Sequence, residues 1–361
     1  MLPYFIAILT SISVFFVGYR FKFNDFALIV TMVIASLPLI ILTGFKHIKV
    51  GTDTGSYIFY FNKIVSFKDA LDIASTNGEI GFWLLNSIGH LITDDYFIIF
   101  TLSAIIIACC YFYALAIFNY KTLSLATLLL IGPYFFQLNG TRQAIAIAIF
   151  AVSVIFIIKK QPIRYIISIF VGFLFHKSII ICLPLYLIFR KDIKPKKVAV
   201  IILAFIIVLV FFQTFINFAA SIDDRYSSYG DRTESHGGVV VSMFNILLFG
   251  WFIVCRNTNH AILGTRTFDT LLTLYLIGVL ISLLSIVLKV DPSGFLRMSL
   301  YFIQMNIFLL PMTICSFRDT NTRIILIIAG SLLMTLYFYM TTSAFSNLTP
   351  YRFNPIIEAA Q

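Results

Sequence analysis

Long apolar runs separated by short polar segments dominate the chain. In order, they lie near 3–18, 26–45, 96–118, 122–138, 143–158, 165–189, 198–219, 240–255, 268–288, 297–316 and 324–341. A run of about 20 apolar residues is long enough to cross a bilayer as an α-helix. The pattern therefore predicts an all-α polytopic membrane protein with about ten transmembrane helices.

The run 165–189 differs from the others because His176-Lys177-Ser178 interrupts it and basic residues flank both of its ends. Short loops rich in Lys and Arg stay in the cytoplasm, so a segment with two such flanks must enter the membrane and return. About 25 residues can form two half-length helices but not two full crossings. The segment is therefore predicted to be a broken or re-entrant hairpin with His176 near its tip.

The distribution of charge sets an orientation for the chain. If the turn at Arg20 is cytoplasmic, the cytoplasmic loops hold fifteen of the 26 Lys and Arg residues but only four of the 16 Asp and Glu residues. This asymmetry follows the positive-inside rule and places both termini on the external side.

Composition supports the membrane assignment. The chain is 60% hydrophobic and 12% charged, with a mean hydropathy of +0.97, which excludes a soluble domain of this length. The first apolar run has neither a basic leader nor a small-residue cleavage site, so it is predicted to be a membrane helix. The five cysteines lie within or at the ends of apolar runs, without metal-like spacing, and indicate neither a disulfide framework nor a zinc site.

We therefore expect one integral-membrane domain over residues 1–361, with two longer external loops at 46–95 and 220–239. Loop 46–95 contains short apolar stretches with Tyr57 and Trp83, typical of helices lying at the membrane interface. The net charge of +10 does not form one patch, since most basic residues mark cytoplasmic loops. We therefore expect no nucleic-acid partner.

The polar clusters that carry candidate chemistry all fall on the predicted external side. Arg142 opens a helix, where free backbone N–H groups and the helix dipole favour an anion. Arg297 enters a later helix, and guanidinium groups match phosphate or pyrophosphate oxygens. Arginine at an interface also commonly snorkels, and Asp53 in a Gly/Thr/Ser loop commonly caps a turn. No nucleotide-binding motif is present, so an activated sugar would have to arrive on a lipid carrier.

Several short motifs, taken in order, resemble a known family. They are Gly51-x-Asp53-x-x-x-Tyr57, Glu79-x-Gly81-Phe82, Arg142-Gln143-x-x-Ala146, His176-Lys177-Ser178 before Leu183-Pro184, Arg297-x-x-x-Tyr301-Phe302 and Pro350-Tyr351. Together they are similar to the EpsG-type polysaccharide polymerases, which are Wzy-like enzymes of O-antigen, capsule and exopolysaccharide assembly.

The resemblance implies a GT-C-like, multi-pass glycosyltransferase of the bacterial inner membrane with its active site facing the periplasm. It would transfer a growing glycan from undecaprenyl pyrophosphate to the non-reducing end of a new lipid-linked repeat unit. A chain-length regulator and a flippase of the same pathway are the expected partners. No cofactor is expected and no metal is demanded, although Asp53 or the acidic loop at 223–236 could hold one.

Roles for individual residues follow from this chemistry. Arg142 and Arg297 would take up the charge that develops on the leaving pyrophosphate, with Lys177 or Arg232 assisting. His176 and Asp53 are the candidate bases for the attacking hydroxyl, and Glu79 is the third. Arg225, Gln143, Tyr57 and Tyr301 are expected to contact the pyrophosphate or the glycan.

Three alternatives remain open on the sequence. An O-antigen ligase uses the same lipid but usually carries a much larger external loop. A flippase or secondary transporter should show matching halves with interrupted helices, and no clear repeat is visible. A membrane-bound acyltransferase would need cytosolic access to acyl-CoA, whereas His176 is predicted to face outward.

Overall fold

The structure, a computed structural model, describes residues 1–21, 24–222 and 238–355, apart from the side chains of residues 219, 222 and 292. The described residues form helices and contain no strand, and Lys46 and Phe353 make one isolated bridge pair. The prediction of an all-α polytopic membrane protein is confirmed. The residues divide into two compact units, Met1–Leu183 with Ile324–Gln361, and Pro184–Arg323, each described by itself below.

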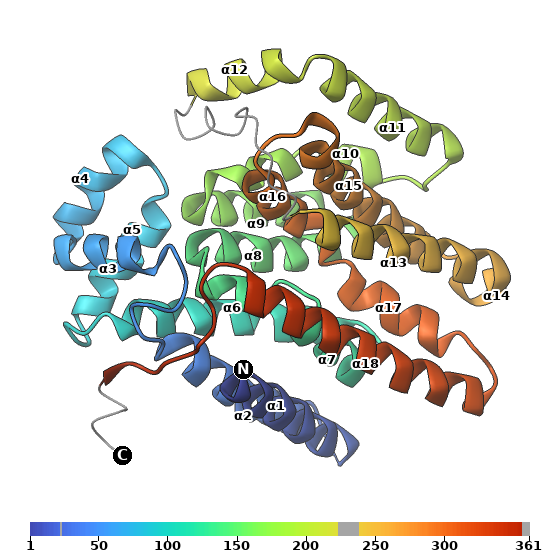
Figure 1. The fold of residues 1–361 in the computed structure, drawn as a ribbon, viewed down its shortest axis with the longest axis horizontal. Coiled ribbons are helices and arrows are strands. Elements are labelled where there is room, and N and C mark those ends of the chain that lie inside the picture. The colour runs from blue at the N-terminus through green and yellow to red at the C-terminus, as the bar shows by residue number, and fades with distance from the viewer. Residues whose placement is uncertain (22–23, 223–237, 356–361) are drawn as a thin grey trace. The chain divides into compact units, whose positions relative to one another are not determined.

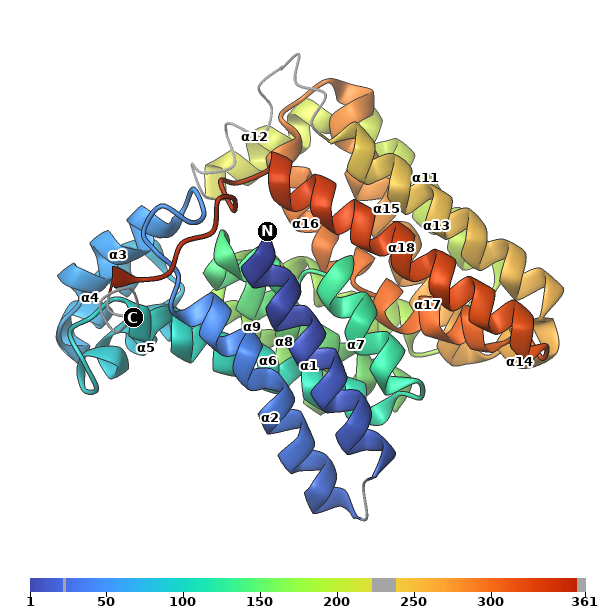
Figure 2. The same ribbon diagram turned by 60° about the horizontal axis from the view of Figure 1, so that its bottom comes forward.

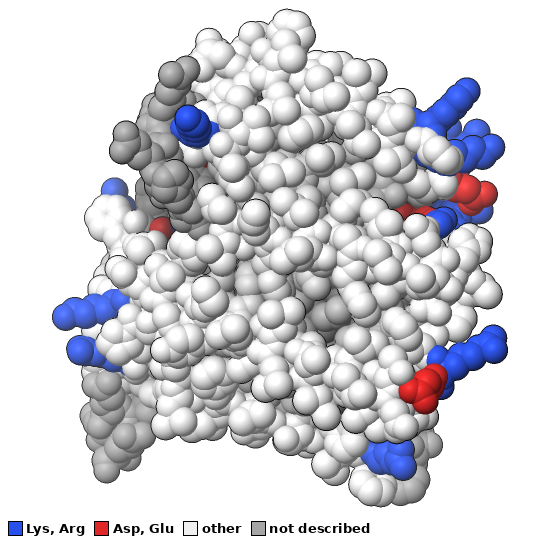
Figure 3. Space-filling model, turned by 45° about the vertical axis from the view of Figure 1, so that its right-hand side comes forward, with Lys and Arg blue, Asp and Glu red and all other residues white. Residues whose placement is uncertain are grey.

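Seven described helices are each long and apolar enough to cross a membrane. They are α1 (Leu2–Arg20), α2 (Asp25–Gly44), α6 (Phe97–Ile117), α8 (Thr141–Ile158), α13 (Val239–Thr258), α15 (Arg266–Leu288) and α18 (Thr320–Ala344). Two bent pairs raise the number to nine if each pair is one span. These pairs are α11 (Pro195–Val210) with α12 (Phe212–Ile222), and α16 (Pro292–Ile303) with α17 (Asn306–Cys315). Most of the side chains visible in Figure 3 are uncharged, as expected for helices that face lipid.

The apolar run 122–138 does not form one span. Helix α7 (Lys121–Leu130) ends shortly before Gly132-Pro133, and a short 3-10 helix, η1 (Tyr134–Leu138), follows. Proline cannot donate a backbone hydrogen bond and stops the preceding helix. Residues 139 and 140 then connect η1 to the start of α8.

Helix α8 forms the centre of the first unit, and 78% of its most apolar window is buried. It packs on α6, on α9 (Pro162–Phe175) and on both 3-10 helices, η1 and η2 (Lys177–Cys182). Buried alanines at 144, 146, 148 and 151 let these neighbours approach its backbone closely. Helices α1 and α2 run side by side in both ribbon views and cover one side of the unit (Figure 1, Figure 2).

Three short helices fill the predicted loop 46–95. They are α3 (Thr54–Lys63), α4 (Phe67–Asn77) and α5 (Ile80–His90), and none is long enough to count as a span. A capping box between Ser66 and Asp69 starts α4. Helix α5 packs against α4, α6 and α9. These contacts place the start of α5 beside the end of α9.

The predicted hairpin at 165–189 breaks at His176. Helix α9 ends at Phe175, His176 is extended with φ −156° and ψ 123°, and η2 begins at Lys177. The hydroxyl of Tyr165 donates to the carbonyl oxygen of Cys182 at 2.5 Å and so joins the two arms. The chain then continues in α10 (Leu185–Phe189), which belongs to the second unit.

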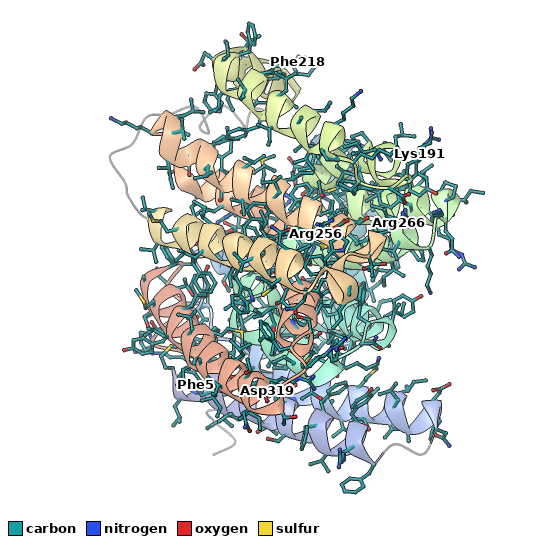
Figure 4. All side chains as sticks on the ribbon, turned by 90° about the vertical axis from the view of Figure 1, so that its right-hand side faces the viewer. Phe5, Lys191, Phe218, Arg256, Arg266 and Asp319 are labelled. Carbon is teal, nitrogen blue, oxygen red and sulfur yellow. The ribbon has the colours of Figure 1, made fainter. Side chains whose placement is uncertain are left out.

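In the second unit, α15 packs against α11, α13, α16 and α17. At one end, Arg256 of α13 forms a two-pronged ion pair with Asp269 of α15, at 2.6 and 3.0 Å. Arg266 donates to the carbonyl oxygen of Phe189 at 2.9 Å. Figure 4 labels Lys191, Arg256 and Arg266 near one another at this end of the unit. All three belong to segments that the sequence predicts to be cytoplasmic.

Candidate functional site

Glu79 is the centre of a charged cluster in the first unit. One carboxylate oxygen lies 2.5 Å from Nη1 of Arg142, and the other lies 2.8 Å from Nδ1 of His176. The second oxygen also accepts the backbone N–H of Lys177 at 3.3 Å. The cluster therefore joins the start of α5, the first turn of α8 and the break between α9 and η2. Sequence motifs that lie far apart in the chain meet at this carboxylate.

The backbone around Glu79 explains how this side chain is aimed. Glu79 is the N-cap of α5 and adopts a left-handed conformation, with φ 59° and ψ 39°. Gly78 has φ +68° and ψ −156°, a region that essentially only glycine occupies. A Cβ at Gly78 would also lie 2.7 Å from Cε of Lys177. The indole Nε1 of Trp83 donates to the carbonyl oxygen of Gly78 at 2.6 Å and holds this turn in place.

Exposure decides which members of the cluster a ligand can touch. The side chain of Glu79 is 0% exposed, whereas those of Arg142 and His176 are 23% and 20% exposed. A buried carboxylate needs partners, and here it has a cation and a histidine. Glu79 is thus placed to orient its two neighbours, while Arg142 and His176 present the accessible atoms.

Aromatic rings surround the guanidinium group of Arg142. Its Cζ lies 5.2 Å from the ring centre of Trp83, 5.7 Å from Tyr57 and 5.9 Å from Phe82. Rings at such distances attract a cation through their quadrupoles and limit its movement. The charge of Arg142 is therefore held in one place although its surface is partly open.

Asp53 lies in a second polar group that adjoins the first. Its backbone N–H and the hydroxyl of Thr52 both donate to Oδ1 of Asn139, at 3.1 and 2.8 Å. Asn139 precedes the first turn of α8 by two residues, so this contact ties Asp53 to the helix that carries Arg142. Gly51 makes the contact possible, because it has φ +87° and a Cβ there would meet the carbonyl oxygen of Leu138 at 2.0 Å.

Tyr57 lies between the two polar groups. Burial raises the pKa of its hydroxyl, and the charge of Asp53 acts in the same direction, while that of Arg142 opposes it. Both charges therefore act on the same phenol. The hydroxyl stays protonated at neutral pH and can serve as a hydrogen-bond donor.

The remaining candidate residues are distributed as follows. Gln143 is buried beside Arg142 in α8, and Lys177 begins η2 with its aliphatic stem against Gly78. Arg297 and Tyr301 belong to α16 of the second unit, where Tyr301 is fully buried. Arg225 and Arg232, with most of the predicted loop 220–239, lie outside the described residues.

The model of one protein family matches residues 29–353, which is most of the chain. The chain belongs to the EpsG family. No curated protein and no solved structure matches it. The resemblance found in the sequence motifs is thus confirmed, and membership of the EpsG family indicates a polysaccharide polymerase with glycosyltransferase-like chemistry.

The structure adds one residue to this EpsG-family site that the sequence motifs did not single out. Lys46 follows α2 by two residues and is completely buried, although a lysine just beyond an apolar span ordinarily reaches water. Its burial depends on residues 138 and 353, which are far away in the sequence. Within the described part of the chain, no group of three His, Cys, Asp or Glu side chains is placed to hold a metal ion.

The C-terminal segment of this EpsG-family protein also packs against residues 45–53, the loop between α2 and α3, which we call the Asp53 loop. His47 donates its backbone N–H to the carbonyl oxygen of Arg352 at 3.0 Å, and Gly51 donates to that of Asn347 at 3.2 Å. Asn139 Nδ2 donates to the hydroxyl of Ser346 at 3.2 Å. We call residues 346–354 the C-terminal strap.

Proposed function

We propose that the protein is a Wzy-type polymerase of O-antigen or exopolysaccharide. It transfers a growing glycan from undecaprenyl pyrophosphate to the non-reducing end of a new lipid-linked repeat unit. The reaction takes place at the periplasmic face of the bacterial cytoplasmic membrane. A flippase and a chain-length regulator act in the same pathway.

The observation that carries this proposal is the buried carboxylate of Glu79, which holds an accessible arginine and an accessible histidine side by side. Transfer from a lipid pyrophosphate needs two catalytic groups. One takes up negative charge on the leaving group, and the other accepts the proton of the attacking hydroxyl. Arg142 supplies the first group and His176 the second, and Glu79 fixes the distance between them.

Arg142 is assigned to the pyrophosphate. Its guanidinium group keeps its charge at all relevant pH values and matches phosphate oxygens through two parallel hydrogen bonds. An apolar cavity of about 380 Å³ adjoins this cluster and is lined mainly by α4, the start of α5 and the end of α9. Apolar lining next to a fixed cation suits a ligand with a hydrocarbon chain and a charged head.

His176 is assigned as the base. In the tautomer that carries its proton on Nδ1, the atom 2.8 Å from the Glu79 carboxylate, the other ring nitrogen, Nε2, can accept a proton. The acceptor hydroxyl attacks the anomeric carbon, the bond from that carbon to the pyrophosphate oxygen breaks, and the hydroxyl proton passes to Nε2. A single direct displacement inverts the anomeric centre. Asp53 is the second candidate base, whereas the burial of Glu79 favours an orienting role over proton abstraction.

The other site residues complete the proposal. Lys177 and Gln143 assist Arg142 at the phosphates, and Tyr57 donates its hydroxyl proton to a bound oxygen. Arg297, Tyr301, Arg225 and Arg232 remain proposed contacts of the pyrophosphate or the glycan on the basis of the sequence alone.

The test uses cells whose own gene is deleted and replaced on a plasmid. Wild-type protein is expected to restore a ladder of polymer lengths on a gel, and Glu79→Gln, Arg142→Ala and His176→Gln are not, at equal protein amounts in the membrane. A single repeat unit attached to its acceptor in the deletion strain identifies a polymerase. Absence of any attached unit would identify a ligase instead, and repeats retained on the cytoplasmic side would identify a flippase.

A further inference from the structure

Lys46 is buried in the first unit by groups from four different segments. Its side chain is 0% exposed, and Nζ donates to the hydroxyl oxygen of Thr54 at 2.9 Å and to the carbonyl oxygen of Leu138 at 2.6 Å. Nζ also lies 4.0 Å from the ring centre of Phe100 in α6. The backbone of Lys46 pairs with Phe353 in the C-terminal strap.

The two hydrogen-bond acceptors of Lys46 stand directly beside candidate site residues. Thr54 follows Asp53 and opens α3, and its own hydroxyl proton is donated to the carbonyl oxygen of Val50 at 2.5 Å. Leu138 ends η1, and its neighbour Asn139 receives the hydrogen bonds from Thr52 and Asp53. Lys46 thus connects the start of α3 to the entry of α8, which carries Arg142.

We propose that Lys46 is a positioning residue whose buried ammonium group clamps the Asp53 loop to the entry of α8. The distance between Asp53 and Arg142 is thereby set. This inference rests on the proposed function, because it names a residue that acts through two members of the proposed site. Since Lys46 is fully buried, it acts on a substrate only through the groups that it places.

The electrostatic setting supports a role beyond simple packing. Burial lowers the pKa of the Lys46 amine to about 7, and the nearby charge of Asp53 partly opposes that shift. A charged group that is so poorly solvated destabilises the fold relative to an apolar side chain of the same shape. An apolar residue would satisfy packing alone, so the amine is explained by the two hydrogen bonds that it donates.

The experiment compares Lys46→Met, which keeps the length of the side chain, with Lys49→Met, an exposed lysine of the same loop. For Lys46→Met we expect a fall of roughly 100-fold in polymer per membrane-inserted molecule, as for small misplacements of reacting groups. Its melting temperature in detergent at pH 7 should equal or exceed that of the wild type. Lys49→Met should behave as the wild type in both measurements. Normal polymer from Lys46→Met, or a parallel loss of polymer and thermal stability, overturns the inference.

A second measurement does not depend on activity. Ile58 lies on α3 and is 9% exposed, so Ile58→Cys, in a chain whose five native cysteines are replaced, reports whether α3 stays docked. Modification by a polar maleimide is expected to accelerate about tenfold when Lys46→Met is added, because α3 loses its clamp. An unchanged rate overturns the clamp even if the protein is a polymerase. Conversely, failure of the wild type to restore polymer, with the rate increased, contradicts the proposed function and leaves the clamp established.

Discussion

Glu79 and Arg142 form an ion pair with 2.5 Å between Oε2 and Nη1, although 63 positions separate them in the chain. The carboxylate is fully buried, whereas the guanidinium group is partly open. Removing the carboxylate therefore leaves a half-buried cation with neither its partner nor full hydration.

Glu79→Gln should abolish polymer formation and destabilise the first unit by about 3 kcal/mol, because breaking a buried ion pair leaves one charge uncompensated. Melting of the purified protein in detergent and the polymer ladder measure the two effects. Asp94→Asn is the matched control, since Asp94 also contacts a histidine, His90, but its side chain is 93% exposed. Equal effects of the two substitutions would argue against a special role for Glu79.

Arg142→Lys should lower polymer formation by about 100-fold while the protein remains folded. Lysine keeps the charge but loses the planar fork that matches two phosphate oxygens, and one lost donor to a developing oxyanion has an effect of this size. Polymer per molecule is measured in the complemented deletion strain. Arg164→Lys, at an exposed position in α9, should leave the ladder unchanged. A full ladder from Arg142→Lys would show that only the positive charge at this position is needed, and not the planar guanidinium group.

Gly78→Ala should destabilise the protein by about 1–3 kcal/mol, because the backbone conformation of Gly78 is one that a Cβ disfavours. The new methyl group would also displace the stem of Lys177. Gly250→Ala is the control, since a Cβ there meets no atom within 4 Å and alanine favours the helix. Melting temperatures in detergent should move in opposite directions for the two variants, and the same direction for both would contradict the account of Gly78.

The stability of the wild type should rise with pH between about 7 and 10 relative to Lys46→Met. Burial lowers the pKa of Lys46 from 10.5 to about 7, so the unfolded chain binds more protons than the folded protein in that range. The penalty is complete below pH 7 and declines by at most about 1.4 kcal/mol per pH unit above it. Melting both proteins across this range measures the difference, and a difference independent of pH would show that the amine is not desolvated.

The sequence predicted the helical class and the break at His176, because both follow from local patterns of apolar and charged residues. It also predicted that Asp53, Glu79, Arg142 and His176 lie on one side of the membrane, and this stays a prediction. It did not predict that Glu79 is the shared partner of Arg142 and His176, since that depends on how α5, α8 and α9 pack.

Two kinds of feature escaped the sequence for physical reasons. The bend of 81° between α11 and α12 falls at Phe211, where neither proline nor glycine marks it. The burial of Lys46 depends on contacts with distant segments. The local sequence pattern of a lysine beyond an apolar span is the same whether its side chain is exposed or buried. By contrast, Pro133 is a local signal for the end of α7. The prediction of one span over 122–138 missed it because it relied on hydropathy alone.

The C-terminal strap has a consequence for the synthesis of the protein. The Asp53 loop leaves the ribosome early. Its backbone N–H groups at His47 and Gly51 pair with the carbonyl groups of Arg352 and Asn347, which are made about 300 residues later. A nascent or prematurely terminated chain can insert its first helices but cannot complete the loop that adjoins Arg142. The loop that adjoins Arg142 is therefore completed only after residues 346–354 have been translated.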